Sequence, residues 1–530
     1  MQLRGRGLRI LAGGAAAFLI AGHACGQSES PNVLRKAFPA PGADRCAALT
    51  GTQVETGIVE GAERYAQGAT VVGGATAGAK ASTELCRVRL RLRPVEGSDI
   101  NVEVWLPDSW NKKLFGFGGA GFDGGLSLGG ARLLNKVVAQ GYAAVETDVG
   151  HKLAPNLTTW ANLKTWAPKH PEKLIDMGYR GNHLAALVAK QVIADYYGTP
   201  AKRAYFLGCS NGGRDGIMEV SRYPEDYDGV IAGAPSVRYI GVVTQLIWYS
   251  MAVHGPGGAP DLASKLNLVH DAIIKQCDML DGVKDGILES PLLCHFDPAK
   301  LQCKGGDAPN CLTNAEVRAL RKIYGGTRLS TGEEVVAGPA LGGEGVPNNW
   351  TAVVTTPEAA VVGEDFYRWM VYDDPNWKIE DFNLDRDYRV ARARLAPILD
   401  PDDPDLSAFT RRGGKLIIYQ GWDDPVVPPT NTIEYYESVR RRIGPAAARQ
   451  VRLFMVPGMT HCAGGPGATS FDMQPVLEKW VERGEAPEKV VAVKPGSGDP
   501  PMSHPLCAWP MTAHYHGSGS TEDAANFTCR

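Results

Sequence analysis

The chain has 530 residues, of which 44% are hydrophobic and 21% are charged, and its formal net charge is −3 at pH 7. This composition is typical of a globular protein with a large core and excludes disorder over most of the chain. Because no block of like charge accompanies the small net charge, we expect neither a nucleic acid nor a membrane surface as a partner. A small molecule or a peptide is the default ligand.

The first 26 residues are predicted to be a secretory signal peptide. Two arginines precede a small and apolar stretch from Leu8 to Ala21, and small residues follow through Gly26. Cleavage after Gly26 would leave ten of the 11 cysteines, an even number for disulfides in an oxidising compartment. Cleavage after Ala24 is an alternative, and so is a lipid anchor on Cys25, although the usual apolar residue three positions earlier is missing. We therefore expect a secreted or periplasmic protein, and no later segment is apolar and long enough to span a bilayer.

Strand-like and helix-like segments alternate in the first half of the chain. Strands are expected at residues 99–106, 113–117 and 141–147, a helix at 183–197 and a further strand at 204–207. This alternation predicts a mostly parallel sheet covered by helices, which is the α/β class.

The last of these strands leads into a G-x-S-x-G motif. Gly208-Cys209-Ser210-Asn211-Gly212 follows the strand as a nucleophile elbow does, at the carboxyl end where α/β sheets carry their sites. Alone, the motif arises by chance in many glycine-rich chains, and this chain has 63 glycines. A serine hydroxyl also needs an imidazole to take its proton and a carboxylate to orient that imidazole.

The pattern of the chain changes after about residue 236. Glycine-rich segments, closely spaced cysteines and aromatic clusters replace the strands, which return at 415–419 and 451–456. The simplest account is one α/β domain with an insertion of about one domain's length, which would lie over the active site as a lid. The predicted organisation is a signal peptide at 1–26, a first catalytic part at 27–236, a lid domain at 237–400 and a second catalytic part at 401–530.

An acid and a histidine follow the elbow in the order of an α/β-hydrolase. Asp424 follows one of the returning strands, and His461 follows the other after a Pro-Gly turn. The G-x-x-D spacing favours Asp424 over Asp423 as the acid. A lone aspartate in such a turn is more often a turn former, but the joint order predicts a triad with Ser210.

Cys209 and Cys462 lie directly beside the serine and the histidine. If these cysteines are bonded, their Cα atoms lie about 4.4 to 6.8 Å apart, which brings the two segments together across roughly 250 residues.

An acyl-transfer reaction also needs backbone donors for its oxyanion. The amide of Asn211 is expected to be one, and the glycine-rich loop at 116–124 is expected to supply the second. A phosphate or dinucleotide site is the alternative, but the loop lacks the Lys-Ser/Thr of a Walker motif, and a dinucleotide site needs a following helix and a distant acid.

Three aspartates lie close together in the inserted segment, at Asp278, Asp281 and Asp285. Clustered carboxylates and glycine turns suit calcium rather than zinc, although the spacing is not that of an EF-hand. A solvated acidic turn is the alternative. We expect the calcium to be structural, and no cofactor for catalysis.

These motifs together resemble the tannase and feruloyl esterase family, whose members carry a Cys-Ser, Asp, His-Cys arrangement. The segments at 208–214 and 457–465 resemble its two signatures, and the run at 277–287 resembles its lid calcium site. The resemblance covers nearly the whole mature chain and implies an α/β-hydrolase fold with a large lid domain inserted between the nucleophile and the catalytic acid.

The resemblance also implies individual residues. The second oxyanion donor would be Gly121, although the loop departs from the family's common Gly-Asn-Gly-Gly form. The calcium ligands would be the side chains of Asp278, Asp281 and Asp285 and the carbonyls of Val283 and Ile287. The disulfides would be Cys46–Cys86, Cys209–Cys462, Cys277–Cys294, Cys303–Cys311 and Cys507–Cys529, a choice that counting cysteines cannot make.

The family includes a hydrolase of mono(2-hydroxyethyl) terephthalate, so several aromatic acyl groups fit the resemblance. We expect lid aromatics to clamp the acyl ring, with Arg368 as a carboxylate partner, although such clusters are more often core. The aromatic candidates are Trp350, Phe366, Tyr367, Trp369, Tyr372 and Trp377.

The sequence therefore predicts a secreted serine carboxylesterase that cleaves esters of aromatic carboxylic acids of the feruloyl or hydroxycinnamoyl type through an acyl-enzyme. Galloyl or mono(2-hydroxyethyl) terephthalate specificity is the alternative within this chemistry. Two functions outside it are an inactive calcium-dependent binding protein on a hydrolase scaffold and a peptidase. The three triad residue types disfavour the binding protein, and the lack of a recognisable peptide-binding strand disfavours the peptidase.

Overall fold

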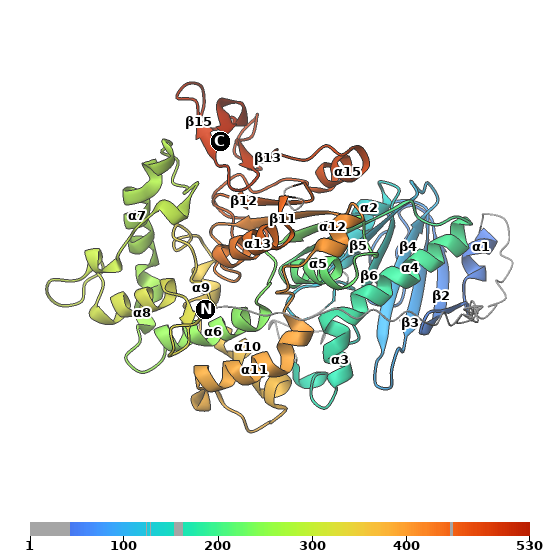
Figure 1. Ribbon diagram of the computed structural model, residues 1–530, viewed down its shortest axis with the longest axis horizontal. Coiled ribbons are helices and arrows are strands. Elements are labelled where there is room, and N and C mark those ends of the chain that lie inside the picture. Colours follow the sequence, from blue (N-terminus) through green and yellow to red (C-terminus); the bar gives the residue numbers. More distant parts are fainter. Residues whose placement is uncertain (1–42, 123, 128, 153–162, 446–448) are drawn as a thin grey trace, which may run out of the picture. The chain divides into compact units, whose positions relative to one another are not determined.

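The computed structural model describes residues 43–122, 124–127, 129–152, 163–445 and 449–530 (Figure 1). The predicted signal peptide at 1–26 lies outside the described residues. Within these ranges, no helix has the length and apolar character that crossing a membrane requires.

A ten-stranded sheet is the main element of the unit Pro39–Arg530. Its strands, in spatial order, are β1 (Gln53–Val54), β2 (Gly57–Tyr65), β3 (Leu85–Leu92), β4 (Ile100–Pro107), β6 (Ala143–Thr147), β5 (Lys113–Phe117), β7 (Arg203–Cys209), β8 (Gly229–Gly233), β11 (Lys415–Gly421) and β12 (Val451–Val456). The neighbours from β1 to β6 pair antiparallel, and those from β6 to β12 pair parallel. The predicted α/β class with a largely parallel sheet is confirmed.

Helices cover both faces of the parallel part of the sheet. Tyr205 of β7 packs in a core cluster with side chains from two of these helices, α2 and α15. Its neighbour Phe206 lies against Gly216 of a third helix, α5, because successive strand residues point to opposite faces. The helices that accompany the whole sheet, including α1 beside the antiparallel strand β2, are α1 (Ala43–Ala48), α2 (Gly130–Val138), α3 (Pro171–Ile175), α4 (Gly181–Tyr197), α5 (Asn211–Arg222), α12 (Ser407–Arg411), α13 (Pro429–Ile443) and α15 (Gln474–Arg483).

The segment between β8 and α12 is mostly helical and has a core cluster to which Trp350, Phe366 and Tyr367 contribute fully buried side chains. Figure 1 shows its helices, from green to orange, grouped apart from the antiparallel strands β2 to β4. Its helices and strands are α6 (Tyr239–Val253), α7 (Leu266–Cys277), α8 (Asn314–Tyr324), β9 (Thr327–Arg328), β10 (Glu334–Val336), α9 (Trp350–Val353), α10 (Glu358–Asp365) and α11 (Leu384–Leu399).

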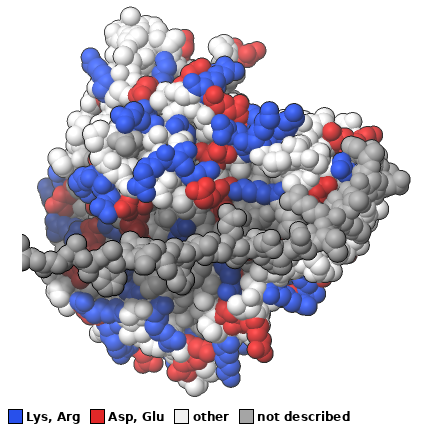
Figure 2. Space-filling model, turned by 45° about the vertical axis from the view of Figure 1, so that its right-hand side comes forward, with Lys and Arg blue, Asp and Glu red and all other residues white. Residues whose placement is uncertain are grey.

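Two short antiparallel strand pairs follow α15 at the C-terminal end. They are formed by β13 (Lys489–Val493) with β14 (Ser503–Cys507), and by β15 (Ala513–Tyr515) with β16 (Phe527–Cys529). On the face of the molecule in Figure 2, basic and acidic side chains are interspersed.

Five disulfides join the described residues, and their pairs are those that the family resemblance implies. They are Cys46–Cys86, Cys209–Cys462, Cys277–Cys294, Cys303–Cys311 and Cys507–Cys529. Cys209–Cys462 spans 253 residues and joins the end of β7 to the loop after β12.

A buried ion pair between β3 and β4 stabilises the antiparallel part of the sheet. The Arg87 guanidinium is fully buried and donates from Nε to Oε2 of Glu103 at 2.8 Å and from Nη2 to Oε1 at 2.5 Å. It also donates to the carbonyls of Val72 and Gly73, and Glu103 accepts from Thr76. The Arg87 and Glu103 side chains are only 0% and 4% exposed, so water hardly screens the attraction between their charges.

We predict that Arg87→Met lowers the free energy of unfolding by about 3 to 5 kcal/mol, because it leaves the Glu103 carboxylate buried without its partner. Denaturant unfolding measures the loss. Arg321→Met is the matched control, since the Arg321 pair with Asp297 is exposed and should contribute little. Equal losses in the two variants would contradict the prediction.

Candidate active site

Ser210 lies in the sharp turn between β7 and α5. Its φ is 63° and its ψ is −121°, a region that costs a non-glycine residue about 1 to 3 kcal/mol. The turn is fixed because the Ser210 amide donates to the carbonyl of Gly233 at 3.0 Å. A Cβ on Gly208 would lie 2.3 Å from the carbonyl oxygen of Gly212, so only glycine allows the helix to start this close to the strand. These contacts explain the G-x-S-x-G pattern and give the turn the sharp strand-to-helix geometry of a nucleophile elbow.

Asp424 and His461 form a hydrogen-bonded pair. The Nδ1 atom of His461 lies 2.8 Å from Oδ2 of Asp424. The buried carboxylate also accepts from the amides of Val426 and Val427 at 2.8 and 3.0 Å, and from Gln420 Nε2 at 3.0 Å. These bonds fix its orientation, whereas the His461 side chain keeps 21% of its surface exposed. The imidazole is therefore both oriented and accessible.

The disulfide places the histidine loop beside the elbow. The Cα atoms of Cys209 and Cys462 are 5.9 Å apart, so those of their neighbours Ser210 and His461 are separated by no more than about 14 Å. The loop after β12 that carries His461 (the histidine loop) also contacts the loop after β11 that carries Asp423 and Asp424 (the acid loop). The amide of Asp423 donates to the carbonyl of Met459 at 2.9 Å. The three triad candidates therefore come from loops at the carboxyl ends of β7, β11 and β12, as the sequence predicts.

The glycine-rich loop after β5 passes against the start of α5. A Cβ on Gly118 would lie 2.7 Å from the Cα of Gly212, so the two backbones are in direct contact. Gly121, in the same loop, has a φ of 59°, and Asn211 is buried at the first turn of α5. Amides at this helix start and in the loop can together hold a negatively charged oxygen.

Two residues that the sequence did not single out hydrogen bond to the glycine-rich loop. The carboxylate of Asp215 in α5 accepts from the amide of Gly119 at 3.2 Å, and the hydroxyl of Tyr239 in α6 donates to the carbonyl of Gly121 at 2.9 Å. Asp215 lies in the first turns of the helix that starts in the G-x-S-x-G motif, so its position in the sequence could have indicated that it lies near the site. Tyr239 offered none, because it lies in the inserted segment.

Asp423 lies against the inserted segment. Its carbonyl accepts from Asn349 Nδ2 at 2.8 Å. Burial raises the pKa of Asp423 to about 8, and the nearby Glu344 carboxylate adds to this effect. Burial also raises the pKa of Glu344 to about 7, although that carboxylate accepts from the Tyr324 hydroxyl at 2.8 Å. The acid loop and the insertion thus meet at two neighbouring buried carboxyl groups.

The three aspartates of the predicted calcium loop each cap a backbone amide. Asp278 accepts from Gly286, Asp281 from Val283 and Asp285 from Ile287, at 2.8 to 3.0 Å. Burial raises the pKa of Asp281 to about 6 and also raises that of Asp285, and carboxylate neighbours add to both shifts. A cation would relieve this repulsion, and carboxylate and carbonyl oxygens are the donors that calcium prefers.

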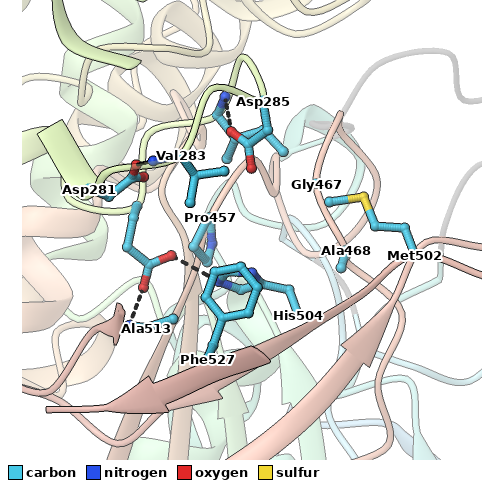
Figure 3. Close-up of a pocket in the computed structure, with 12 residues that line it drawn as sticks. Asp281, Val283, Asp285, Pro457, Gly467, Ala468, Met502, His504, Ala513 and Phe527 are labelled. Carbon is cyan, nitrogen blue, oxygen red and sulfur yellow. Dashed lines mark hydrogen bonds and ion pairs between the residues drawn. The ribbon is translucent and has the colours of Figure 1, made fainter. Parts of the chain in front are cut away.

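A cavity of about 20 Å³ lies between this loop and the C-terminal strands (Figure 3). Asp281 and Asp285 line one part of it, and Pro457, His504 and Phe527 line another. The volume is about that of one water molecule or ion. Within the described ranges, no group of three or more His, Cys, Asp or Glu side chains is arranged to hold a metal. The loop therefore fits calcium in its donor chemistry but would have to tighten around the ion.

The proposed acyl-pocket residues lie in and beside the core of the insertion. The Phe366 ring is buried, with its centroid 6.3 Å from that of Phe122 at the end of the glycine-rich loop. Arg368 pairs with Glu364, donates from Nε to the carbonyl of Trp377 at 2.9 Å, and lies over the partly buried Trp369 ring. A role for Arg368 as a carboxylate partner would require an exchange of these contacts.

Comparisons with known proteins identify the family. The model of the family "Tannase and feruloyl esterase" matches residues 86–530. The chain belongs to the tannase and feruloyl esterase family. An uncharacterized esterase of Xanthomonas campestris pv. campestris is 35% identical over 492 residues, which cover 84% of each chain. The mono(2-hydroxyethyl) terephthalate hydrolase of Piscinibacter sakaiensis is 32% identical over 529 residues, 86% of each.

The solved structures agree with this assignment to the tannase and feruloyl esterase family. Feruloyl esterase B from Aspergillus oryzae superposes with a TM-score of 0.80 at 25% identity, covering 92% of this chain and 99% of that one. The present chain is a carboxylic ester hydrolase with an α/β-hydrolase fold.

We predict that Asp423 makes the protein less stable as the pH rises. An aspartate titrates near pH 4 in the unfolded chain, and Asp423 titrates at about 8 in the folded one. Between these values the folded state binds a proton that the unfolded state does not, so the free energy of unfolding falls as the pH rises from about 4 to about 8. Melting temperatures of the wild type and Asp423→Asn over this interval measure the effect. The melting temperature of the variant should rise relative to that of the wild type as the pH rises. Parallel curves of melting temperature against pH would contradict the prediction.

Proposed function

We propose that this chain is a secreted serine carboxylesterase that hydrolyses esters of aromatic carboxylic acids through Ser210, His461 and Asp424. The observation that carries the proposal is the hydrogen bond between Asp424 and His461. The residue after His461, Cys462, forms a disulfide with Cys209, the residue before Ser210. The five disulfides support an oxidising compartment and hence export.

The triad would work by nucleophilic catalysis. The Ser210 hydroxyl attacks the ester carbonyl while the free ring nitrogen of His461 takes its proton, and Asp424 orients the imidazole and stabilises its positive charge. The amides of Asn211 and Gly121 hold the oxyanion of the tetrahedral intermediate. His461 then donates the proton to the leaving alcohol, which leaves the acyl group on Ser210. A water molecule, deprotonated by His461, attacks this acyl-enzyme, and the acid leaves as Ser210 recovers its proton.

The acyl group is proposed to be aromatic, of the feruloyl or hydroxycinnamoyl type. Feruloyl esterase B shares the fold of this chain, and the terephthalate hydrolase of Piscinibacter sakaiensis also acts on an ester of an aromatic acid. A mono(2-hydroxyethyl) terephthalate or galloyl specificity is the alternative within the same chemistry. We propose that residues 237–400 form a lid whose Phe366, Arg368 and Trp369 contact the acyl group, which the proximity of Phe366 to Phe122 supports.

Calcium is proposed to bind the side chains of Asp278, Asp281 and Asp285 and the carbonyls of Val283 and Ile287. Bound there, the ion would supply positive charge that offsets the clustered carboxylates, with no part in the chemistry at Ser210. The loop contacts the histidine loop, because a Cβ on Gly458 would lie 3.3 Å from the Ile287 side chain. Its ordering would therefore stabilise both the insertion and the C-terminal part.

We predict that Ser210→Ala abolishes turnover and that Asp424→Asn lowers kcat by about 10³ to 10⁴-fold, since the imidazole loses the carboxylate that orients it. Asp423→Asn is the matched control. It should keep kcat within about threefold of the wild type, because His461 hydrogen bonds to Asp424 and this contact is retained. Initial rates on methyl ferulate, methyl gallate and mono(2-hydroxyethyl) terephthalate measure both the triad and the acyl preference. Turnover by Ser210→Ala, or a larger loss in Asp423→Asn than in Asp424→Asn, would refute the assignment.

We predict that calcium raises the melting temperature by several degrees and that EGTA reverses this, because an ion that binds only the folded state stabilises it by mass action. Asp281→Asn and Asp285→Asn should abolish the calcium response and the binding heat in calorimetry. Asp271→Asn, which changes an exposed aspartate of α7, should keep both. A melting temperature independent of calcium in the wild type would reject the site.

A further inference from the structure

The segment of the glycine-rich loop that contains Gly121 is held by a hydrogen bond at each end. At its start, the Gly119 amide donates to Oδ2 of Asp215 at 3.2 Å. At its end, the Gly121 carbonyl accepts from the hydroxyl of Tyr239 at 2.9 Å. A peptide unit is planar, so each bond fixes the rotation of one peptide plane. The plane that carries the Gly121 amide lies between these two fixed planes.

Both anchors contact the same buried arginine. Arg214 is fully buried, and its Nη2 donates to Oδ1 of Asp215 at 2.6 Å. Its guanidinium carbon lies 5.4 Å from the ring centroid of Tyr239. Its Nε donates to Oδ1 of Asn211 at 2.7 Å. One rigid, planar cation therefore contacts both anchors of the loop and the residue that carries the other oxyanion donor.

The hydroxyl of Tyr239 is separable from the packing of its ring. The ring is buried, and it makes an edge contact with Phe122 at 5.6 Å between centroids in addition to the contact with Arg214. A phenylalanine would keep both contacts and lose the bond to Gly121. Gly121 has a φ of 59° and no side chain, so its own conformational preferences restrain rotation of its carbonyl only weakly. The bond thus restrains a flexible position whose amide must point at the oxyanion.

We infer that Tyr239 is a positioning residue for the oxyanion hole, and that its hydroxyl holds the Gly121 carbonyl so that the loop presents its amide to the tetrahedral intermediate. The inference rests on the proposed function, in which that amide binds the oxyanion. Tyr239 begins α6, the first helix of the inserted segment. The insertion thus contributes to the catalytic machinery at its first helical residue.

The test compares Tyr239→Phe with Tyr197→Phe. Both variants remove a hydroxyl that donates to a backbone carbonyl, because Tyr197 donates to Pro107 at 2.6 Å. Pro107 ends β4, which runs antiparallel to β6, so it lies at the sheet edge opposite the carboxyl ends that carry the triad loops. Tyr239→Phe should lower kcat on the preferred aromatic methyl ester about tenfold and change KM less than twofold, since a misplaced donor weakens the transition state and not the bound substrate. Tyr197→Phe should keep kcat, with a melting temperature similar to that of Tyr239→Phe.

A second readout uses phenylboronic acid, which forms a tetrahedral anionic adduct with an active-site serine. Its inhibition constant should rise in Tyr239→Phe in parallel with the loss of kcat/KM, whereas inhibition by the planar product acid should stay unchanged. Unchanged kcat and unchanged boronate affinity in Tyr239→Phe would overturn the inference, and so would equal losses in the two variants.

The wild-type enzyme separates this inference from the proposed function. Ester turnover and labelling of Ser210 by a fluorophosphonate show that the triad chemistry holds, and a full kcat in Tyr239→Phe then overturns only the positioning role. A wild type that neither turns over aromatic esters nor becomes labelled overturns the proposed function and the inference with it.

Discussion

The Cys209–Cys462 disulfide determines where the histidine loop lies. In the sheet, β8 and β11 separate β7 from β12. Three strand spacings amount to about 14 Å, yet the two cysteine Cα atoms are 5.9 Å apart. The loop after β12 must therefore fold back across the ends of β11 and β8 toward the elbow. The backbone of this loop turns sharply, with positive φ values of 66° at Cys462 and 75° at Gly464.

This path explains why the carboxylate that contacts His461 follows β11. The loop crosses directly over the end of that strand, where Asp424 accepts from the amides of Val426 and Val427 and lies within hydrogen-bond distance of His461. On the chain-entropy model, closing so long a loop stabilises the fold by up to about 5 kcal/mol. For the proposed triad the positional effect is more important, because misplacing a catalytic group by about 1 Å can cost 100-fold in rate.

The sequence predicted the parts of the site that local pattern determines. The elbow follows from a strand, two glycines and a serine, and the G-x-x-D spacing selected Asp424, the carboxylate that His461 contacts. The partners of Arg368 were also readable, since Glu364 is four residues earlier on the same helical face. An aromatic run such as Phe366 and Tyr367 has no such local signal, because core and pocket demand the same residue types.

The features of the site that the sequence did not predict depend on contacts between distant segments. The family resemblance supplied the disulfide pairs, since counting cysteines leaves many pairings open. No spacing rule relates Tyr239 to Gly121, which are 118 residues apart. The burial of Asp423 also depends on a distant loop, which begins near Gly342 and carries Glu344. The contacts of Tyr239 and Asp423 can therefore be recognised only from the three-dimensional structure, in which the insertion packs against the loops of the sheet.

The two ends of the insertion meet beside the glycine-rich loop. The amide of Ile240, at the start of α6, donates to Oδ1 of Asp400, just after α11, at 3.1 Å. Arg214 of the nucleophile helix donates to the carbonyl of Leu399, the last residue of α11, at 3.4 Å. A segment anchored at both ends moves least near its anchors and most far from them. In the proposed lid, the remote helices would therefore move to admit substrate while Tyr239, near an anchored end, keeps its hydrogen bond to the Gly121 carbonyl.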